Sequence, residues 1–161
     1  MLQVITVMSI AVLVALDQII KLLVIKYLEP IGSLPLIDDF IQLNYAENTG
    51  AAFGSFSGYT WVLSIFTLVV IVAGFVYLLS GKLKFGVEYV CVALILAGGL
   101  GNLIDRILRG FVVDYIEPLF IDFAIFNFAD ILVTCSAVVL IIWMIYGIYK
   151  DAKKEKEQKN A

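Results

Sequence analysis

The chain has 161 residues, of which 62% are hydrophobic and 16% are charged, and its mean hydropathy is +1.01. A soluble domain of this length cannot hide so much apolar surface in one small core, so lipid must be the solvent for most of the protein. The net charge is −3 with no basic stripe, which argues against a nucleic-acid partner, and the absence of histidine removes the commonest general base and metal ligand.

Four apolar segments are long enough to cross a bilayer as helices, which takes about 20 residues. The first lacks the basic leading segment and the small-residue cleavage site of a signal peptide, so we expect it to be a retained anchor. The pattern predicts one all-α membrane domain, residues 1–161, with four transmembrane helices and a small β-like flap outside the membrane. The expected spans are 4–26, 59–80, 87–108 and 125–149, with an outer loop at 27–58 and a frayed, solvated tail at 150–161.

The first span carries an acid and a base near its outer end. Asp17 and Lys21 are four residues apart with the acid first, which places them on one helical face as a favourable pair. At 1.5 Å per residue, Asp17 lies about 20 Å along the helix from residue 4. We interpret the pair as a structural bridge that neutralises itself.

The outer loop is rich in Gly, Pro, Asn and Asp, and it contains one short alternating segment, FIQLNYA. We expect this loop to form a small sheet-like flap at the membrane surface. The motif NTGAAFG follows, in which Asn48 and Gly50 favour a turn and the small residues allow a peptide backbone to approach. A loop of this length with apolar residues is typical of a functional segment.

The third and fourth spans each carry polar residues at their outer end. Asn102, Asp105 and Arg106 share one face of the third span, about 22 to 27 Å along the helix from residue 87. Asn127 and Asp130 repeat the spacing in the fourth span. Three helices thus bring polar groups to one depth near the outer boundary of the hydrocarbon, where ionisable residues are functional candidates by default.

The lysines indicate the orientation. Lys82 and Lys84 lie in the short loop between the second and third spans, and five more lysines lie in the tail. Seven basic residues thus lie on this side of the membrane and four lie toward the other side. The positive-inside rule therefore predicts that this loop and both termini are cytoplasmic. The polar depth is then close to the outer face of the membrane.

The available side chains favour one chemistry. There is no Ser–His or Cys–His pair, no glycine-rich phosphate loop, and no set of residues that suggests a metal or cofactor. Two neighbouring carboxylates share a proton, so one can act as base on a water while the other acts as acid. Peptide hydrolysis at the outer membrane boundary is our hypothesis. The alternative is a small carrier or proton-translocating subunit, although the inner halves of all four spans are apolar.

Five short motifs in this order resemble one known family: LDQIIK (16–21), NTGAAFG (48–54), GNLIDR (101–106), VVDYI (112–116) and FNFAD (126–130). The chain resembles lipoprotein signal peptidase, also called signal peptidase II. The resemblance implies an aspartic endopeptidase of the bacterial cell membrane that contacts membrane lipids and cuts diacylglyceryl-modified prolipoproteins before the lipid-modified cysteine. It also implies inhibition by globomycin-type cyclic peptides.

The resemblance also assigns roles to residues. It maps the catalytic pair onto Asp114 and Asp130, although Asp114 by itself is equally well interpreted as a loop residue at a helix start. Support residues map onto Asp17, Lys21, Asn48, Asn102, Asp105, Arg106 and Asn127. Among these we expect substrate-binding or support roles for Asn48, Gly50, Asn102, Arg106 and Asn127, and a structural polar network of Asp17, Lys21 and Asp105. Three departures from the family pattern, Tyr115, Ala124 and Ile131, leave every carboxylate in place.

Overall fold

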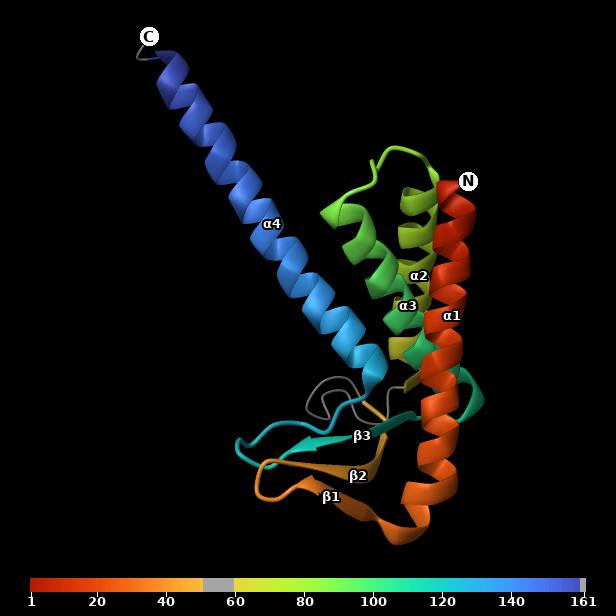
Figure 1. The fold of residues 1–161 in the computed structure, drawn as a ribbon. Helices are drawn as coiled ribbons and strands as arrows, with labels where there is room; N and C mark the ends of the chain where they lie inside the picture. The colour runs from red at the N-terminus through yellow and green to blue at the C-terminus, as the bar shows by residue number, and fades with distance from the viewer. Residues whose placement is uncertain (51–59, 160–161) are drawn as a thin grey trace.

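The computed structural model describes residues 1–50 and 60–159, in which four long helices form a bundle with a small sheet at one end (Figure 1). The helices are α1 (Leu2–Leu23), α2 (Thr60–Leu79), α3 (Val87–Leu108) and α4 (Phe128–Lys159). A π-helical turn (Val24–Leu28) and a 3-10 turn (Glu29–Ile31) extend α1. The strands are β1 (Ser33–Ile37), β2 (Ile41–Asn48) and β3 (Val112–Pro118). The predicted membrane fold of four helices and a small sheet is confirmed.

The helix α3 lies at the centre of the bundle and contacts each of the other three helices. Two of its glycines allow this close packing near the sheet. A Cβ at Gly98 would meet the carbonyl oxygen of Ala129 in α4, and a Cβ at Gly101 would lie 2.5 Å from a carboxylate oxygen of Asp17 in α1. The helix α4 contacts α3 at this end and diverges from the bundle toward the two termini (Figure 1).

The sheet is antiparallel in the order β1-β2-β3 and combines two distant parts of the chain. The sequence pattern predicted a flap from the loop before the second span. The third strand, however, comes from the segment between α3 and α4. Its sequence VVDYIEP is rich in β-branched and aromatic residues, which favour a strand, and it pairs with β2 so that Asp114 lies opposite Ala46.

A cluster of apolar side chains fixes the sheet against the C-terminal end of α1. Its buried members are Val24 and Leu28 from the π-helical turn and Val113 and Tyr115 from β3. Burial of such side chains is worth about 1.5–3 kcal/mol each. Because Val113 and Tyr115 face α1, the alternation of the strand directs Asp114 to the opposite face of the sheet.

The fourth helix differs from its predicted bounds. It begins at Phe128 rather than residue 125, and it continues through Lys159, so the prediction of a frayed tail is wrong for 150–159. Lys, Glu, Gln and Ala are good helix formers, and an existing helix extends without a new nucleus. Residues 51–54 of the NTGAAFG motif lie outside the described residues.

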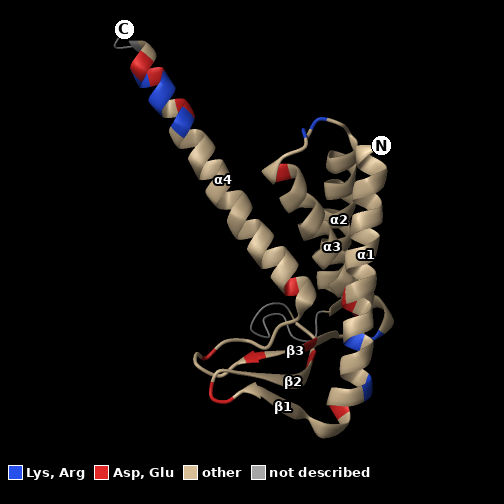
Figure 2. Ribbon diagram, in the orientation of Figure 1, with Lys and Arg blue, Asp and Glu red and all other residues tan. Residues whose placement is uncertain are grey.

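Charged residues separate along the bundle (Figure 2). Most lysines lie at the end that carries both termini and the loop between α2 and α3, where the C-terminal tail also carries acidic residues, whereas most other acidic residues lie around the sheet. Between these ends, large apolar side chains such as Phe66 and Ile142 are more than 60% exposed, as expected for a surface in contact with lipid. The protein is therefore a multi-pass membrane protein with chemically different ends.

Candidate active site

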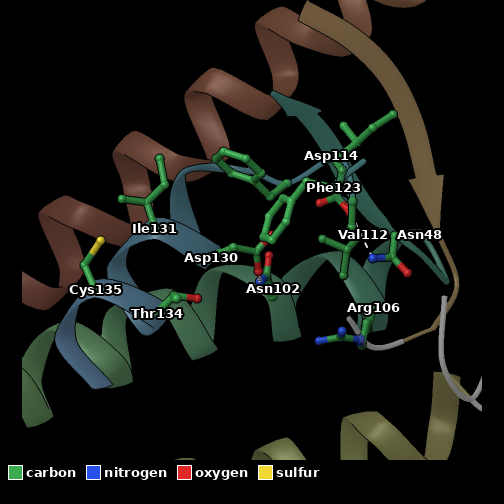
Figure 3. Close-up of a pocket in the computed structure, with 13 residues that line it drawn as sticks. Asn48, Asn102, Arg106, Val112, Asp114, Phe123, Asp130, Ile131, Thr134 and Cys135 are labelled. Carbon is green, nitrogen blue, oxygen red and sulfur yellow. Dashed lines mark hydrogen bonds between the residues drawn. The ribbon is translucent and has the colours of Figure 1, made fainter. Parts of the chain in front are cut away.

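A cavity of about 380 Å³ lies between the strand β3 and the ends of α3 and α4 that are next to the sheet (Figure 3). Its walls combine five polar side chains and an arginine with apolar groups. The lining residues are Asn48, Asn102, Arg106, Val112, Asp114, Phe123, Ala124, Ile125, Phe126, Asp130, Ile131, Thr134 and Cys135. The cavity therefore brings together Asp114 and Asp130, the two predicted catalytic residues, with three of the predicted support residues.

A reciprocal cap at the start of α4 positions Asp130. Its backbone N–H donates to Oδ1 of Asn127 at 3.0 Å, and the backbone N–H of Asn127 donates to Oδ2 of Asp130 at 3.1 Å. This is the arrangement of a capping box, with Asn127 before the first helical residue and Asp130 in the first turn. The hydroxyl of Tyr115 accepts a further free N–H of this turn, from Phe128, at 3.2 Å. The Tyr115 hydroxyl thereby joins the start of α4 to β3.

Three asparagine amides hold the two carboxylates. Nδ2 of Asn127 donates to Oδ1 of Asp114 at 2.6 Å, and Nδ2 of Asn48 donates to Oδ2 at 2.9 Å. Nδ2 of Asn102 donates to Oδ1 of Asp130 at 2.7 Å. Each carboxylate oxygen thus accepts an N–H group, and no cation bonds directly to either acid in the described residues. The ionisation of the pair is therefore governed by burial, by the interaction between the two acids and by these amide hydrogen bonds, with Lys21 acting without direct contact.

The electrostatics of Asp114 differ from those of an exposed aspartate. Burial raises the pKa of Asp114 to about 6, and the negative charge of Asp130 adds to the rise. The hydrogen bonds from Asn48 and Asn127 and the charge of Lys21 act in the opposite direction. A carboxyl group with this pKa keeps its proton up to about pH 6, well above the pH at which an exposed aspartate loses it. Two acids in such a state can serve as acid and base.

Arg106 reaches the cavity with unused hydrogen-bonding capacity. Its Nη2 donates to the carbonyl oxygen of Gly50 at 3.2 Å, while its buried Nε has no partner among residues 1–50 and 60–159. Gly50 does not line the cavity. Its N–H donates to Oδ1 of Asn48 at 2.9 Å, which orients the Asn48 amide toward Asp114. In these ranges no cluster of three His, Cys, Asp or Glu residues is placed to hold a metal ion.

The predicted structural network lies directly behind the cavity. Lys21 is fully buried and bonds to Asp17 at 3.0 Å and Asp105 at 2.9 Å. Asp105 also accepts the backbone N–H of Val113 at 3.1 Å, so it links α3 to the strand that carries Asp114. Sequence reasoning missed two members. Arg109 bonds to Asp105, its partner four residues earlier, and the side chain of Gln18 bonds to both Asp105 and the carbonyl of Gly101.

We expect Asp105→Asn and Asp17→Asn to lower thermal stability together with activity. Each substitution removes a carboxylate that pairs with a buried ammonium, and breaking a buried pair costs about 3 kcal/mol or more. The thermal midpoint of unfolding in detergent and the cleavage rate measure the two effects. Asp38→Asn changes an exposed acid of the sheet and should leave both values unchanged. A midpoint equal to that of the wild type in both network variants would contradict the structural role.

The bundle of four membrane-length helices with a small sheet at one end is the fold of bacterial membrane enzymes. Two solved structures described as bacterial membrane enzymes determined by the in meso method match this fold. The 2.3 Å structure has a TM-score of 0.78 and 33% identity and covers 88% of this chain and 87% of that one. The 1.9 Å structure has a TM-score of 0.75 and 33% identity and covers 86% and 91%.

The family follows from the sequence comparisons. The family model described as signal peptidase (SPase) II matches residues 9–146. The lipoprotein signal peptidase of Halalkalibacterium halodurans is 39% identical over 93% of this chain and 95% of its own length. That of Clostridioides difficile is 38% identical over 87% and 94%. The chain belongs to the signal peptidase II family.

Proposed function

We propose that the protein is an aspartic endopeptidase that removes signal peptides from diacylglyceryl-modified prolipoproteins, with Asp114 and Asp130 as its catalytic pair. Family membership supports the substrate class. The observation that carries the mechanism is that Asp114 and Asp130 line one cavity and are joined through a single residue, Asn127. A direct test is incubation of the purified protein with a diacylglyceryl-modified prolipoprotein, followed by the shift of the product band.

In the proposed reaction, Asp114 begins with a proton and Asp130 begins ionised. Asp130 takes a proton from a water molecule while the water oxygen attacks the scissile carbonyl carbon, and Asp114 gives its proton to the carbonyl oxygen. The resulting diol returns a proton to Asp114 as the C–N bond breaks. Asp130 then gives its proton to the departing amine of the lipid-modified cysteine. Each acid thus returns to its starting state, as expected for an aspartic mechanism.

The other residues of the cavity have matching roles in this proposal. The free Nε–H of Arg106 is placed to donate to a peptide carbonyl of the substrate. Asn48, Asn102 and Asn127 keep the carboxylates in position through their amides. The apolar wall of the cavity includes Phe123 and Ile131, which are 46% and 37% exposed. This wall offers contact to acyl chains of the substrate and of membrane lipids.

The second candidate is a carrier or proton-translocating subunit. Among the described residues, the buried polar side chains cluster at the outer end, and only Thr6 and Ser136 lie apart from that cluster within helices. A conduction path needs polar groups through the whole thickness of the membrane. Ion flux in proteoliposomes without any cleavage would support this alternative over the peptidase.

The orientation can be tested by cysteine labelling. We propose that both termini are cytoplasmic and that the cavity lies near the outer face, on the basis of the lysines at one end (Figure 2). In a background without Cys91 and Cys135, single cysteines at positions 84 and 154 should react only with a reagent on the cytoplasmic side. A cysteine at position 39 should react only from outside. Labelling of position 39 from the cytoplasm would reverse the proposed orientation.

The pH dependence follows from the raised pKa of Asp114. The working pair has one proton, and the pair loses this proton as the pH rises through the pKa of Asp114, about 6 in the free protein. We therefore expect kcat/KM to decline above about pH 6, because this parameter reports the free enzyme. Bound acyl chains exclude water and should hold the proton longer, so kcat should decline at higher pH than kcat/KM. A kcat/KM that rises steadily from pH 5 to pH 8 would contradict this assignment.

A further inference from the structure

The buried ammonium of Lys21 bonds to more than its two carboxylate partners. Its side chain has no exposed surface, and Nζ contacts Asp17 at 3.0 Å, Asp105 at 2.9 Å and Oδ1 of Asn102 at 2.8 Å. An ammonium has three N–H donors and no acceptor. Each donor thus has one partner, and the shortest of the three contacts goes to an amide that lines the catalytic cavity.

This contact determines the orientation of the Asn102 amide. An amide can rotate to exchange its oxygen and nitrogen, and neighbouring groups decide which orientation is stable. Because Lys21 can only donate, the atom that faces it must be the oxygen. The nitrogen of Asn102 then faces Asp130 and donates to its carboxylate at 2.7 Å.

The same constraint extends to the other catalytic acid. Oδ1 of Asn102 also accepts from Nδ2 of Asn127 at 3.1 Å, so the Asn127 nitrogen must lie on that side. Its second N–H is then directed to Asp114 at 2.6 Å. The Asn127 amide is also oriented by the start of α4, because its Oδ1 accepts the backbone N–H of Asp130. The Asn102 oxygen therefore has two donors, the charged ammonium of Lys21 and the neutral amide of Asn127.

We propose that Lys21 is a positioning residue for catalysis: it holds the Asn102 amide as a donor to Asp130 and supports the bond between Asn102 and Asn127, in addition to neutralising Asp17 and Asp105. This inference rests on the proposed aspartic mechanism. Without Lys21, the Asn102 oxygen loses the charged and shorter of its two donors, so the orientation that presents the oxygen to Asp130 becomes less unfavourable. Two oxygens can face each other there only if Asp130 carries a proton, which is the wrong state for a base.

The charges around the pair are consistent with this role. The charged and titratable groups that interact with Asp114 are Asp130 from α4, Lys21 from α1, Arg106 from α3 and Tyr115 on its own strand. Asp17 and Asp105 lie behind them as the partners of Lys21. The charge of Lys21 is among the influences that lower the pKa of Asp114. Loss of Lys21 therefore makes the pair harder to ionise both through the lost charge and through the lost amide orientation.

The test separates positioning from structural support. Lys21→Met alone leaves two carboxylates buried without their ammonium and can fail to fold. The double variant Lys21→Met/Asp17→Asn removes one positive and one negative group, and Asp105 keeps its bond to Arg109. Asp17→Asn alone is the matched control, because it retains the bond from Lys21 to Asn102. Thermal midpoint, kcat, KM and the pH profile are measured for each on a diacylglyceryl-modified prolipoprotein.

In the double variant we expect kcat to fall about ten- to hundredfold, the range for a lost hydrogen bond to a charged group. KM should change little, because Lys21 does not line the cavity. The pH range of activity should move to higher values, because the pair is harder to ionise. Asp17→Asn should be less stable than the wild type without this upward shift.

Two results would overturn the inference. One is a double variant that is folded and retains the kcat and pH range of the wild type. The other is an equal upward shift in Asp17→Asn, which would indicate that the intact charge cluster matters rather than the bond to Asn102. These results differ from those expected if the proposed aspartic mechanism itself is wrong. In that case Asp114→Asn and Asp130→Asn would remain active, whatever the result at Lys21.

Discussion

Asp114→Asn and Asp130→Asn should each abolish turnover while the protein stays folded. Asparagine has nearly the shape of aspartate but cannot take or give the catalytic proton, and a positioned acid or base contributes about 10²- to 10⁴-fold to the rate. The substituted amide at position 114 can still accept one of the two N–H groups that Asn48 and Asn127 donate, so the loss in stability should be small. Cleavage of lipid-modified substrate, thermal midpoint and inhibitor binding measure these properties.

The double variant provides a stricter test of the pair. If the two carboxyl groups act on one water, removing both should be hardly worse than removing either, because residues that act as a unit are not additive. Asp38→Asn, at an exposed acid outside the cavity, is the matched control and should cleave at the wild-type rate. A variant without the Asp114 carboxylate that still cleaves at nearly the wild-type rate would rule out the proposed mechanism.

The second large effect concerns the lipid on the substrate. We expect the protein to cut a diacylglyceryl-modified precursor and to spare the same precursor before lipid transfer. Each methylene buried in an apolar environment contributes about 0.8 kcal/mol, so two acyl chains supply much of the binding free energy. The apolar wall that includes Phe123, Ile131 and Cys135 lies beside the two acids and provides the surface for such contact. Mass spectrometry of the products identifies the cleaved bond.

The controls for this experiment distinguish the classes of protein. A precursor whose cysteine is replaced by serine cannot receive the lipid and should remain uncut. The reaction should proceed in EDTA and should stop with a globomycin-type cyclic peptide. Equal cleavage of the modified and unmodified precursors would show that the acyl chains do not anchor the substrate.

The sequence alone determined the membrane architecture and the composition of the site. About 20 apolar residues define a span whatever the other spans do, so the four crossings follow from local composition. Helical spacing likewise placed Asn102 and Arg106 on one face of α3, where both now line the cavity. A polar residue in hydrocarbon is costly, which makes such positions conspicuous in a sequence.

Only the tertiary structure decided how the acids are held. The pairing of β3 with β2 joins segments more than 60 residues apart, and that register, rather than local propensity, places Asp114 beside Asn48. The bond from Lys21 to Asn102 crosses 81 positions of the sequence and has no local signal, whereas the pair of Lys21 with Asp17 is visible at four-residue spacing. Amide orientation depends on which donors and acceptors surround each asparagine, and in this protein those neighbours come from α1, α3, α4 and the sheet at once.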